Sequence, residues 1–370
     1  MAKHSKFFHT KPKKERVILA SVKINGHRPL WSHKESLLEL ANLTSTVGGE
    51  VVSKISQNLK KPNHTYLGSG KLEELCTIKD FDTLICDDEL TPTQQRNLES
   101  ALNGKKVLDR TALILDVFAN RAQTSEGRLQ VELAQNEYLL PRLQGQWTHL
   151  ERLGGGIGTR GPGETQIETD RRLLRNRISK IKSKIEDVKR HRNIYQNKRK
   201  SEGISVATLV GYTNAGKSTF MNGLTNANVI AENKPFSTLD TVTRKITLKS
   251  GRNILISDTV GLIQKLPSSL VAAFRATLEE INFSKLLIHV IDISDPKAHA
   301  QWQIAHKTFQ ELGISEKPTI VALNKIDRLQ QNGLPIDIDE FEHMPTDFIF
   351  TSALKGIGFE ELLLKLDYML

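Results

Sequence analysis

A glycine-rich stretch in the second half of the chain has the residue types and spacing that bind phosphate. The segment GYTNAGKST (211–219) fits G-x-x-x-x-G-K-[S/T] and stands between the apolar run VATLV and the helix-forming run STFMNGLTN. In such a loop, backbone N–H groups cradle phosphate oxygens, the lysine neutralises the β and γ oxygens, and the next hydroxyl binds Mg²⁺. The predicted phosphate-binding residues are Gly211, Tyr212, Thr213, Asn214, Ala215, Gly216, Lys217, Ser218 and Thr219, and Lys217 is also expected to act in catalysis.

The segment NKID (324–327), which follows the apolar run PTIVAL, predicts the base of the nucleotide. A carboxylate at Asp327 can accept hydrogen bonds from N1–H and from the exocyclic amine of guanine, whereas adenine leaves the carboxylate unpaired. Because an unmet buried hydrogen bond is costly, this arrangement discriminates strongly. We therefore expect GTP and GDP as ligands, with the base bound by Asn324, Lys325 and Asp327 and backed by Ser352, Ala353 and Leu354 of the segment TSAL.

Two further segments are expected to bind the γ-phosphate and the metal ion. In DTVG (258–261), Asp258 can hold Mg²⁺ through water and Gly261 can donate its N–H to the γ-phosphate. Thr238 of PFSTLDT is the candidate switch-I threonine, so Ser218 and Thr238 are the predicted metal ligands and Thr238 and Gly261 are expected to act in catalysis. Leu262 follows DTVG where many such enzymes have a water-orienting glutamine. Unassisted hydrolysis is therefore expected to be slow.

A second glycine-rich segment, GGGIGTRGPGE (154–164), contains a literal G-x-G-x-x-G. A dinucleotide-binding loop follows a buried strand and opens a helix, because the pyrophosphate lies on the helix N-terminus. This segment instead follows the polar, helix-like run RLQGQWTHLERL. Its context therefore opposes dinucleotide binding.

The apolar patterns predict α/β architecture in three parts. Strand-like runs alternate with amphipathic helices in residues 1–124, which indicates a parallel sheet with covering helices. Short β-branched runs separated by helical segments predict a doubly wound P-loop domain over 204–370. Between them, residues 125–200 are expected to form an antiparallel helical hairpin, with the glycine-rich segment at its tip.

The hairpin prediction depends on an apolar seam. Its members recur at a/d spacing in the second helix and need a partner helix. They are Leu174, Ile178, Ile181, Ile185 and Val188, and the expected partner residues are Leu129, Leu133 and Leu140.

The 370-residue chain carries a net charge of +10, and this charge is concentrated in one segment. Residues 170–200 contain thirteen Lys or Arg against three Asp or Glu, an excess equal to the charge of the whole chain. A solvated helix face is the usual explanation, but so dense a charge favours contact with a polyanion such as RNA or DNA. No run is long and apolar enough to span a membrane and no signal core is present, so we expect a cytoplasmic protein. The two cysteines and eleven histidines indicate neither a disulfide framework nor a zinc site.

With these motifs together, the chain resembles the HflX family of translational GTPases, in the Obg-HflX group. The resemblance is carried by DRTALILDVFANRAQTSEGRLQVELAQ, RLGGGIGTRGPGETQIETDRR, PFSTLDTVTR and DTVGLIQKLPSSLVAAFRATLEE, in addition to the P-loop and NKID. It implies an N-terminal α/β domain carrying a helical hairpin, then a G domain, and GTP-dependent binding to the large ribosomal subunit that separates stalled or idle ribosomes. The leucine after D-x-x-G is also the family's pattern.

The resemblance implies that the glycine-rich tip reaches ribosomal RNA. We expect a monomer. The expected RNA contacts are Arg160, Arg171, Arg172 and Arg175. Two alternatives remain open. One is an RNA-binding or ATP-dependent remodelling module acting through the N-terminal domain, although residues 1–150 show no second phosphate motif. The other is a signalling GTPase switch with a protein effector, which leaves the basic hairpin without a role.

Overall fold

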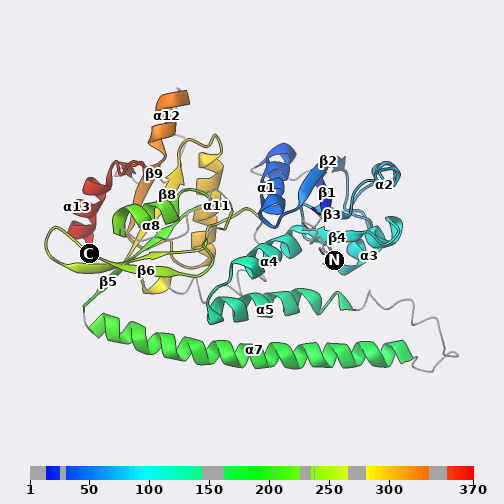
Figure 1. Cartoon of the computed structure of the whole chain (residues 1–370), viewed down its shortest axis with the longest axis horizontal. Coiled ribbons are helices and arrows are strands. Elements are labelled where there is room, and N and C mark those ends of the chain that lie inside the picture. The colour runs from blue at the N-terminus through cyan, green and yellow to red at the C-terminus, as the bar shows by residue number, and fades with distance from the viewer. Residues whose placement is uncertain are drawn as a thin grey trace, which may run out of the picture. The chain divides into compact units, whose positions relative to one another are not determined.

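The computed structural model describes residues 14–25, 31–143, 162–201, 203–225, 235–236, 238–265, 281–332 and 348–370. The chain forms two compact units, Met1–Arg28 with Ser32–Leu113 and Pro29–Trp31 with Ile114–Leu370. Each contains a sheet with helices packed beside it (Figure 1). The expected division into three parts after residues 124 and 200 stays a prediction. Within the described ranges, no helix combines the length and apolarity needed to cross a membrane.

The first unit contains a parallel four-stranded sheet of order β2-β1-β3-β4. Its strands are β1 (Arg16–Ile24), β2 (Glu50–Leu59), β3 (Thr83–Cys86) and β4 (Lys106–Asp109). They alternate with α1 (His33–Thr46), α2 (Ser69–Thr77) and α3 (Pro92–Ala101), which confirms the predicted α/β alternation. Ser32 and Thr91 begin α1 and α3 with capping boxes, so the side chains of these residues satisfy backbone N–H groups at each helix start.

Strand β4 is an element that the sequence pattern did not predict. The segment KVLD has four residues and no clear alternation, and α4 (Arg110–Arg121) follows it with no intervening loop. Asp109 makes this junction possible, because its carboxylate accepts hydrogen bonds from the N–H of Ala112 at 2.8 Å and of Leu90 at 3.0 Å. The side chain thus caps the helix that starts directly after the strand.

The second unit contains a six-stranded sheet of order β10-β9-β8-β5-β7-β6. Its strands are β5 (Ser205–Val210), β6 (Val242–Thr247), β7 (Asn253–Asp258), β8 (Leu286–Asp292), β9 (Thr319–Asn324) and β10 (Phe348–Phe350). All neighbours pair in parallel except β6, which runs antiparallel to β7. The described helices around it are α8 (Lys217–Thr225), α11 (Ala298–Glu311), α12 (Ile326–Asn332) and α13 (Phe359–Met369). This is the predicted doubly wound fold, and it brings the carboxyl ends of five strands to one edge.

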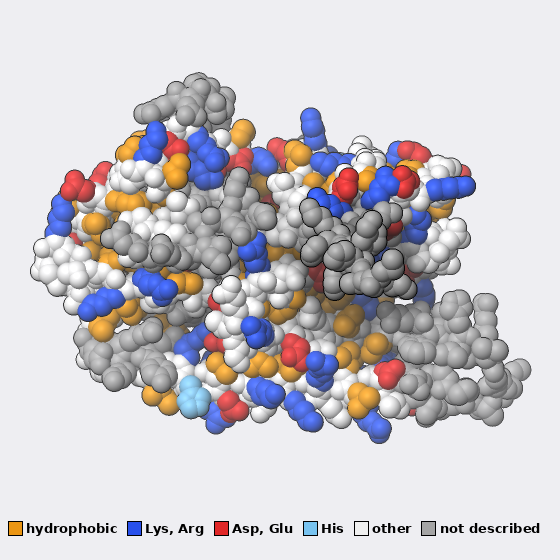
Figure 2. All heavy atoms as spheres, viewed as in Figure 1, with side chains coloured by type: hydrophobic (Ala, Val, Ile, Leu, Met, Phe, Trp, Pro, Cys, Tyr) orange, Lys and Arg blue, Asp and Glu red, His pale blue; other side chains and the backbone are white. Residues whose placement is uncertain are grey.

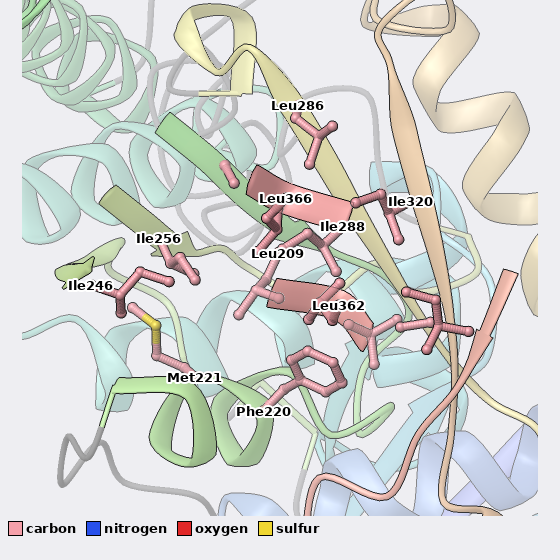
Figure 3. Close-up of a cluster of buried hydrophobic side chains, with 14 of the residues drawn as sticks. Leu209, Phe220, Met221, Ile246, Ile256, Leu286, Ile288, Ile320, Leu362 and Leu366 are labelled. Atoms are coloured by element: carbon pink, nitrogen blue, oxygen red, sulfur yellow. The ribbon is translucent and has the colours of Figure 1, made fainter. Parts of the chain in front are cut away.

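One face of this sheet is covered by α8 and α13. Figure 3 shows Phe220 and Met221 of α8 and Leu362 and Leu366 of α13 converging on apolar side chains of the strands. Leu209 of β5 and Ile288 of β8 are fully buried among them. On the opposite face, Trp302 of α11 belongs to a second cluster with side chains of β8 and β9. Burial on both faces explains why β5, β8 and β9 consist of nearly continuous apolar runs.

The second unit also contains the predicted hairpin, formed by α5 (Ser125–Leu139) and α7 (Pro162–Ser201). Leu133, Ile178 and Ile181 are buried together, and Leu129, Leu140, Leu174 and Ile185 pack against them. These residues confirm the seam, whereas Val188, which was also predicted, does not belong to this cluster. The ion pair Glu126–Arg192 joins the start of α5 to the later part of α7, and Glu137–Lys182 joins the end of α5 to the middle of α7, as antiparallel packing requires. Residues 154–161 of the predicted glycine-rich tip lie outside the described residues, and residues 162–164 form the start of α7.

Candidate nucleotide-binding site

The predicted motif residues meet at the carboxyl edge of the six-stranded sheet. The loop after β5, the ends of β7 and β9 and the loop after β10 surround a cavity of about 240 Å³. The predicted residues that line it are Thr213, Asn214, Gly216, Lys217, Ser218, Thr219, Thr238, Gly261, Asn324, Lys325, Asp327, Ala353 and Leu354.

The other predicted residues lie behind this lining and contact it. Gly211, Tyr212 and Ala215 contribute backbone carbonyls to Lys217 and Asn324, while Asp258 and Ser352 bind lining side chains. Phe236, Thr259 and Arg328 also line the cavity and were not predicted from the sequence. Thr259 lies within the DTVG segment and Arg328 follows NKID, so proximity to a motif could have identified both. Phe236 carries no such signal beyond its place in PFSTLDT.

Two residues of the P-loop have a left-handed backbone conformation, which most residue types disfavour. Asn214 and Gly216 have positive φ values of 63° and 99°, which asparagine and glycine tolerate better than other residues. A Cβ at Gly216 would come within 2.5 Å of Asn324 Nδ2, an amide that donates to the Ala215 carbonyl at 2.8 Å. Glycine at 216 thus permits the base-binding strand end to close against the phosphate-binding loop.

Lys217 extends beneath the P-loop and is buried. Its Nζ donates to the carbonyls of Gly211 at 3.1 Å and Tyr212 at 2.9 Å. Burial lowers the pKa of this ammonium to about 8, against the opposing effect of the Asp258 carboxylate. A phosphate in the cavity would favour the charged form of the lysine.

Three oxygen-bearing side chains converge beside Lys217. Ser218 Oγ lies 2.7 Å from Thr238 Oγ1, and Ser218 and Thr238 donate to Asp258 Oδ2 at 2.8 Å and 3.1 Å respectively. Burial raises the pKa of Asp258, and its Oδ1 has no hydrogen-bond partner within the described residues. Two hydroxyls and a partly unsatisfied buried carboxylate are the hard oxygen donors that Mg²⁺ prefers. These residues therefore fit the predicted metal site.

The base-binding residues are held by a connected set of hydrogen bonds. Ser352 Oγ donates to Asp327 Oδ1 at 2.6 Å, and the Ala353 N–H donates to Asn324 Oδ1 at 2.9 Å. Lys325 Nζ donates to the Asn214 carbonyl at 2.8 Å and to Asp292 Oδ2 at 2.6 Å. Asp327 is thereby held at the cavity wall.

Leu262 stands where many such enzymes have a water-orienting glutamine, and its contacts are structural. Its side chain is buried, its N–H donates to the Gly211 carbonyl at 3.0 Å, and its carbonyl accepts from the Thr213 N–H at 2.7 Å. The neighbouring Gly261 lies so close to the P-loop that a Cβ there would meet the Thr213 Cα at 2.8 Å. The DTVG segment is thus joined to the P-loop through its backbone.

Three of the predicted RNA-contacting residues lie on α7 and are not part of the cavity lining. Arg172 and Arg175 are exposed on α7, whereas Arg171 is half-buried and its Nε has no hydrogen-bond partner among the described residues. Arg160 lies outside the described residues.

Comparison with known proteins agrees with this geometry. A family model described as 50S ribosome-binding GTPase matches residues 206–325. The models GTP-binding GTPase N-terminal and GTP-binding GTPase Middle Region match residues 34–119 and 121–199. Fold, cavity and matches define a P-loop GTPase that binds guanine nucleotide and hydrolyses GTP.

The relatives identify the family. GTPase HflX of Lacrimispora saccharolytica is 46% identical over 360 residues, covering 96% of this chain and 83% of the relative. GTPase HflX of Escherichia coli is 45% identical over 332 residues, covering 89% and 77% respectively. The chain belongs to the HflX family of GTPases.

Solved structures of similar proteins contain GDP. The crystal structure described as the SsGBP and GDP complex superposes with a TM-score of 0.51 at 28% identity, covering 95% of this chain and 98% of that chain. A GTP-binding protein from Sulfolobus solfataricus in complex with GDP covers 96% and 98% respectively, with 27% identity and a TM-score of 0.47.

Proposed function

We propose that this GTPase binds the large ribosomal subunit in its GTP form and promotes the separation of stalled or idle ribosomes. The observation that carries the proposal is an exposed basic surface on α7, defined by Arg172, Arg175, Lys180 and Lys184. The similarity of residues 206–325 to a family described as 50S ribosome-binding supports the choice of partner. The cytoplasmic location and the monomeric state stay predictions.

The basic surface is distinct from the basic residues that stabilise the hairpin. Arg177, Lys182 and Arg192 form ion pairs with Glu132, Glu137 and Glu126 of α5. The four members of the basic surface are exposed and form no ion pair within the described residues. Lys and Arg side chains recur along the surface of α7 in Figure 2. Such a surface gains affinity for RNA by releasing the counterions of the phosphate backbone.

The proposed nucleotide chemistry assigns a role to each part of the cavity. P-loop N–H groups and Lys217 bind the phosphates, and Gly261 donates its N–H to the γ-phosphate. Ser218 and Thr238 would hold Mg²⁺, with Asp258 holding it through water. When bound, Mg²⁺ would neutralise negative charge on the phosphates. Asp327 accepts from guanine, while Asn324, Lys325, Ser352, Ala353 and Leu354 complete the base pocket.

Slow hydrolysis by the free protein follows from Leu262, since its buried hydrocarbon side chain cannot orient water. A partner that orders the switch segments can raise the rate. We propose that the large subunit is this partner.

The structure of the first unit argues against the alternative of an ATP-dependent module that acts through the N-terminal domain. In a parallel sheet of order β2-β1-β3-β4, a ligand would enter at the carboxyl ends of β1 and β3, where the strand order reverses. Arg110 fills this place: it is 1% exposed and donates to Asp87 Oδ1 at 2.7 Å and Glu39 Oε2 at 2.8 Å. The chain's own guanidinium thus occupies the position that a ligand would need.

Phosphate release and ribosome separation test the proposal together. We expect hydrolysis to rise when large subunits are added, with small subunits as the control, and intact ribosomes to separate on sucrose gradients with GTP. Separation with ATP instead would favour the N-terminal alternative. Turnover equally fast without subunits, together with no separation, would contradict the proposal and favour a protein effector.

A further inference from the structure

We propose that Asp240, two residues beyond Thr238, is a positioning residue for GTP binding. It anchors the switch-I segment to the start of α5, and this contact holds Thr238 at the proposed metal site. The inference rests on the metal role proposed for Thr238, and the experiment below tests the two separately.

The anchor consists of hydrogen bonds between segments far apart in the sequence. Asp240 Oδ2 accepts from the N–H groups of Gln123 at 2.7 Å and Thr124 at 2.9 Å, and Oδ1 accepts from the Thr124 hydroxyl. Thr124 is the N-cap of α5, and its Oγ1 also accepts from the Gly127 N–H at 3.0 Å. A carboxylate at a helix N-terminus is favoured by the helix dipole and satisfies N–H groups that lack partners in the helix.

Gly127 provides the space for this carboxylate. A Cβ at position 127 would lie 2.2 Å from Asp240 Oδ1 and 3.1 Å from Thr124 Oγ1. Glycine costs a helix roughly 1 kcal/mol relative to alanine, yet it occupies the third residue of α5. An alanine there would strengthen the helix and displace the carboxylate, which makes it a specific probe of the anchor.

A second contact anchors the same segment on the other side of Thr238. The ring of Phe236 packs edge-on against Phe118 of α4, with the centroids 4.6 Å apart, and both rings are buried. Phe236 has a φ of 55°, a conformation that is strained for a bulky residue and needs compensating contacts. Phe236 also lines the nucleotide cavity. The segment around Thr238 is thus attached to α4 and to the start of α5.

These attachments explain the position of Thr238. Its hydroxyl contacts Ser218 and Asp258 at the metal site through protein contacts alone. Ordering this segment in advance removes a cost that the triphosphate would otherwise have to meet. GDP lacks the γ-phosphate beside which Thr238 acts, so the anchor should favour GTP over GDP.

The experiment measures equilibrium affinities of the full chain for a non-hydrolysable GTP analogue and for GDP with Mg²⁺, and hydrogen exchange of switch I without nucleotide. We expect Asp240→Ala and Gly127→Ala each to lower analogue affinity about 10-fold and to speed exchange. GDP affinity should stay within about twofold, because GDP does not use Thr238. The double variant should bind the analogue no more weakly than Asp240→Ala, because the two changes remove the same contact.

Asp367→Ala is the matched control, since Asp367 also accepts from a backbone N–H and a hydroxyl, both of Ser250, and lies outside the cavity lining. Asp367→Ala should change neither the ratio of analogue affinity to GDP affinity nor the hydrogen exchange of switch I. The inference would be overturned if Asp240→Ala lost analogue affinity and GDP affinity equally, or if Gly127→Ala left analogue affinity unchanged. Thr238→Ala separates the two proposals: if it leaves analogue affinity unchanged, the metal role of Thr238 fails as well.

Discussion

The proposed base selection depends on Asp327, whose carboxylate accepts a hydrogen bond from the hydroxyl of Ser352. We predict that Asp327→Asn weakens GTP binding about 10- to 100-fold, because a lost charge-assisted hydrogen bond costs about 1.5–3 kcal/mol. The same change should improve xanthosine triphosphate binding, since an amide can donate to the xanthine O2. Competition titrations with GTP and XTP measure both effects.

Ser352→Ala is the control for this prediction. It removes the hydroxyl that orients Asp327 but leaves the carboxylate, so affinity should fall for GTP without a gain for XTP. An unchanged preference for GTP in Asp327→Asn would show that Asp327 does not bind the base.

Replacing Leu262 with the glutamine found in many such enzymes is not expected to raise basal hydrolysis. Because its side chain is buried and its backbone pairs with the P-loop, Leu262→Gln places an amide where water cannot reach. We expect no gain in basal GTP hydrolysis and a loss of about 1–3 kcal/mol in the free energy of unfolding. Phosphate release and urea unfolding check these effects. A large rise in basal turnover would show that the side chain can reach the attacking water.

The motif residues could be predicted because each phosphate or base contact depends on a short pattern after an apolar strand. The anchor of Asp240 could not be predicted, since Thr124 and Asp240 are 116 residues apart and no pattern in either segment indicates the other. Phe236 was missed for a related reason, because its position depends on packing against Phe118.

Among the secondary-structure elements, the α5–α7 hairpin is stabilised by a small apolar cluster. We predict that Ile181→Ala, which removes a side chain that is 4% exposed, destabilises the hairpin by about 2–5 kcal/mol. Amide exchange should accelerate in α5 and α7, while guanine-nucleotide affinity changes less than about twofold.

Ile194→Ala on the same helix is the control, because Ile194 is 65% exposed and its loss should shift stability by no more than about 0.5 kcal/mol. Equal effects of the two variants would show that the seam does not hold the helices together.

Helices and strands could be predicted where the apolar repeat extends over many residues, and they were missed where it covers only a few. The a/d seam of α7 spans several turns, so it identified both the helix and its partner. Strand β4 has four residues and merges into α4 at Asp109, so neither alternation nor a turn marks it. Its place in the sheet is set by pairing with β3, which only the fold provides.

The first unit depends on a buried charge network, which sequence periodicity does not reveal. Glu39 and Asp87 approach Arg110 from different elements, and leaving two buried carboxylates without their guanidinium costs about 3–5 kcal/mol. We predict that Arg110→Met lowers the unfolding free energy of this unit by that amount without changing nucleotide affinity. Lys71→Met, which breaks the exposed pair with Glu74, should have little effect. Equal stability of the two variants in urea would contradict this account.

The second unit contains both the nucleotide cavity and the basic surface of α7 that we propose binds the ribosome. The most direct measurement is the salt dependence of binding to large ribosomal subunits, with a non-hydrolysable GTP analogue. Arg172→Glu with Arg175→Glu should weaken binding and reduce the slope against log salt by about 0.7–0.9 per lost phosphate contact. Lys60→Glu with Lys61→Glu makes the same change in net charge on exposed residues of the first unit and should leave the slope unchanged. Equal effects of both pairs, or wild-type binding by the α7 variant, would contradict the assignment of α7 as the ribosome-binding surface.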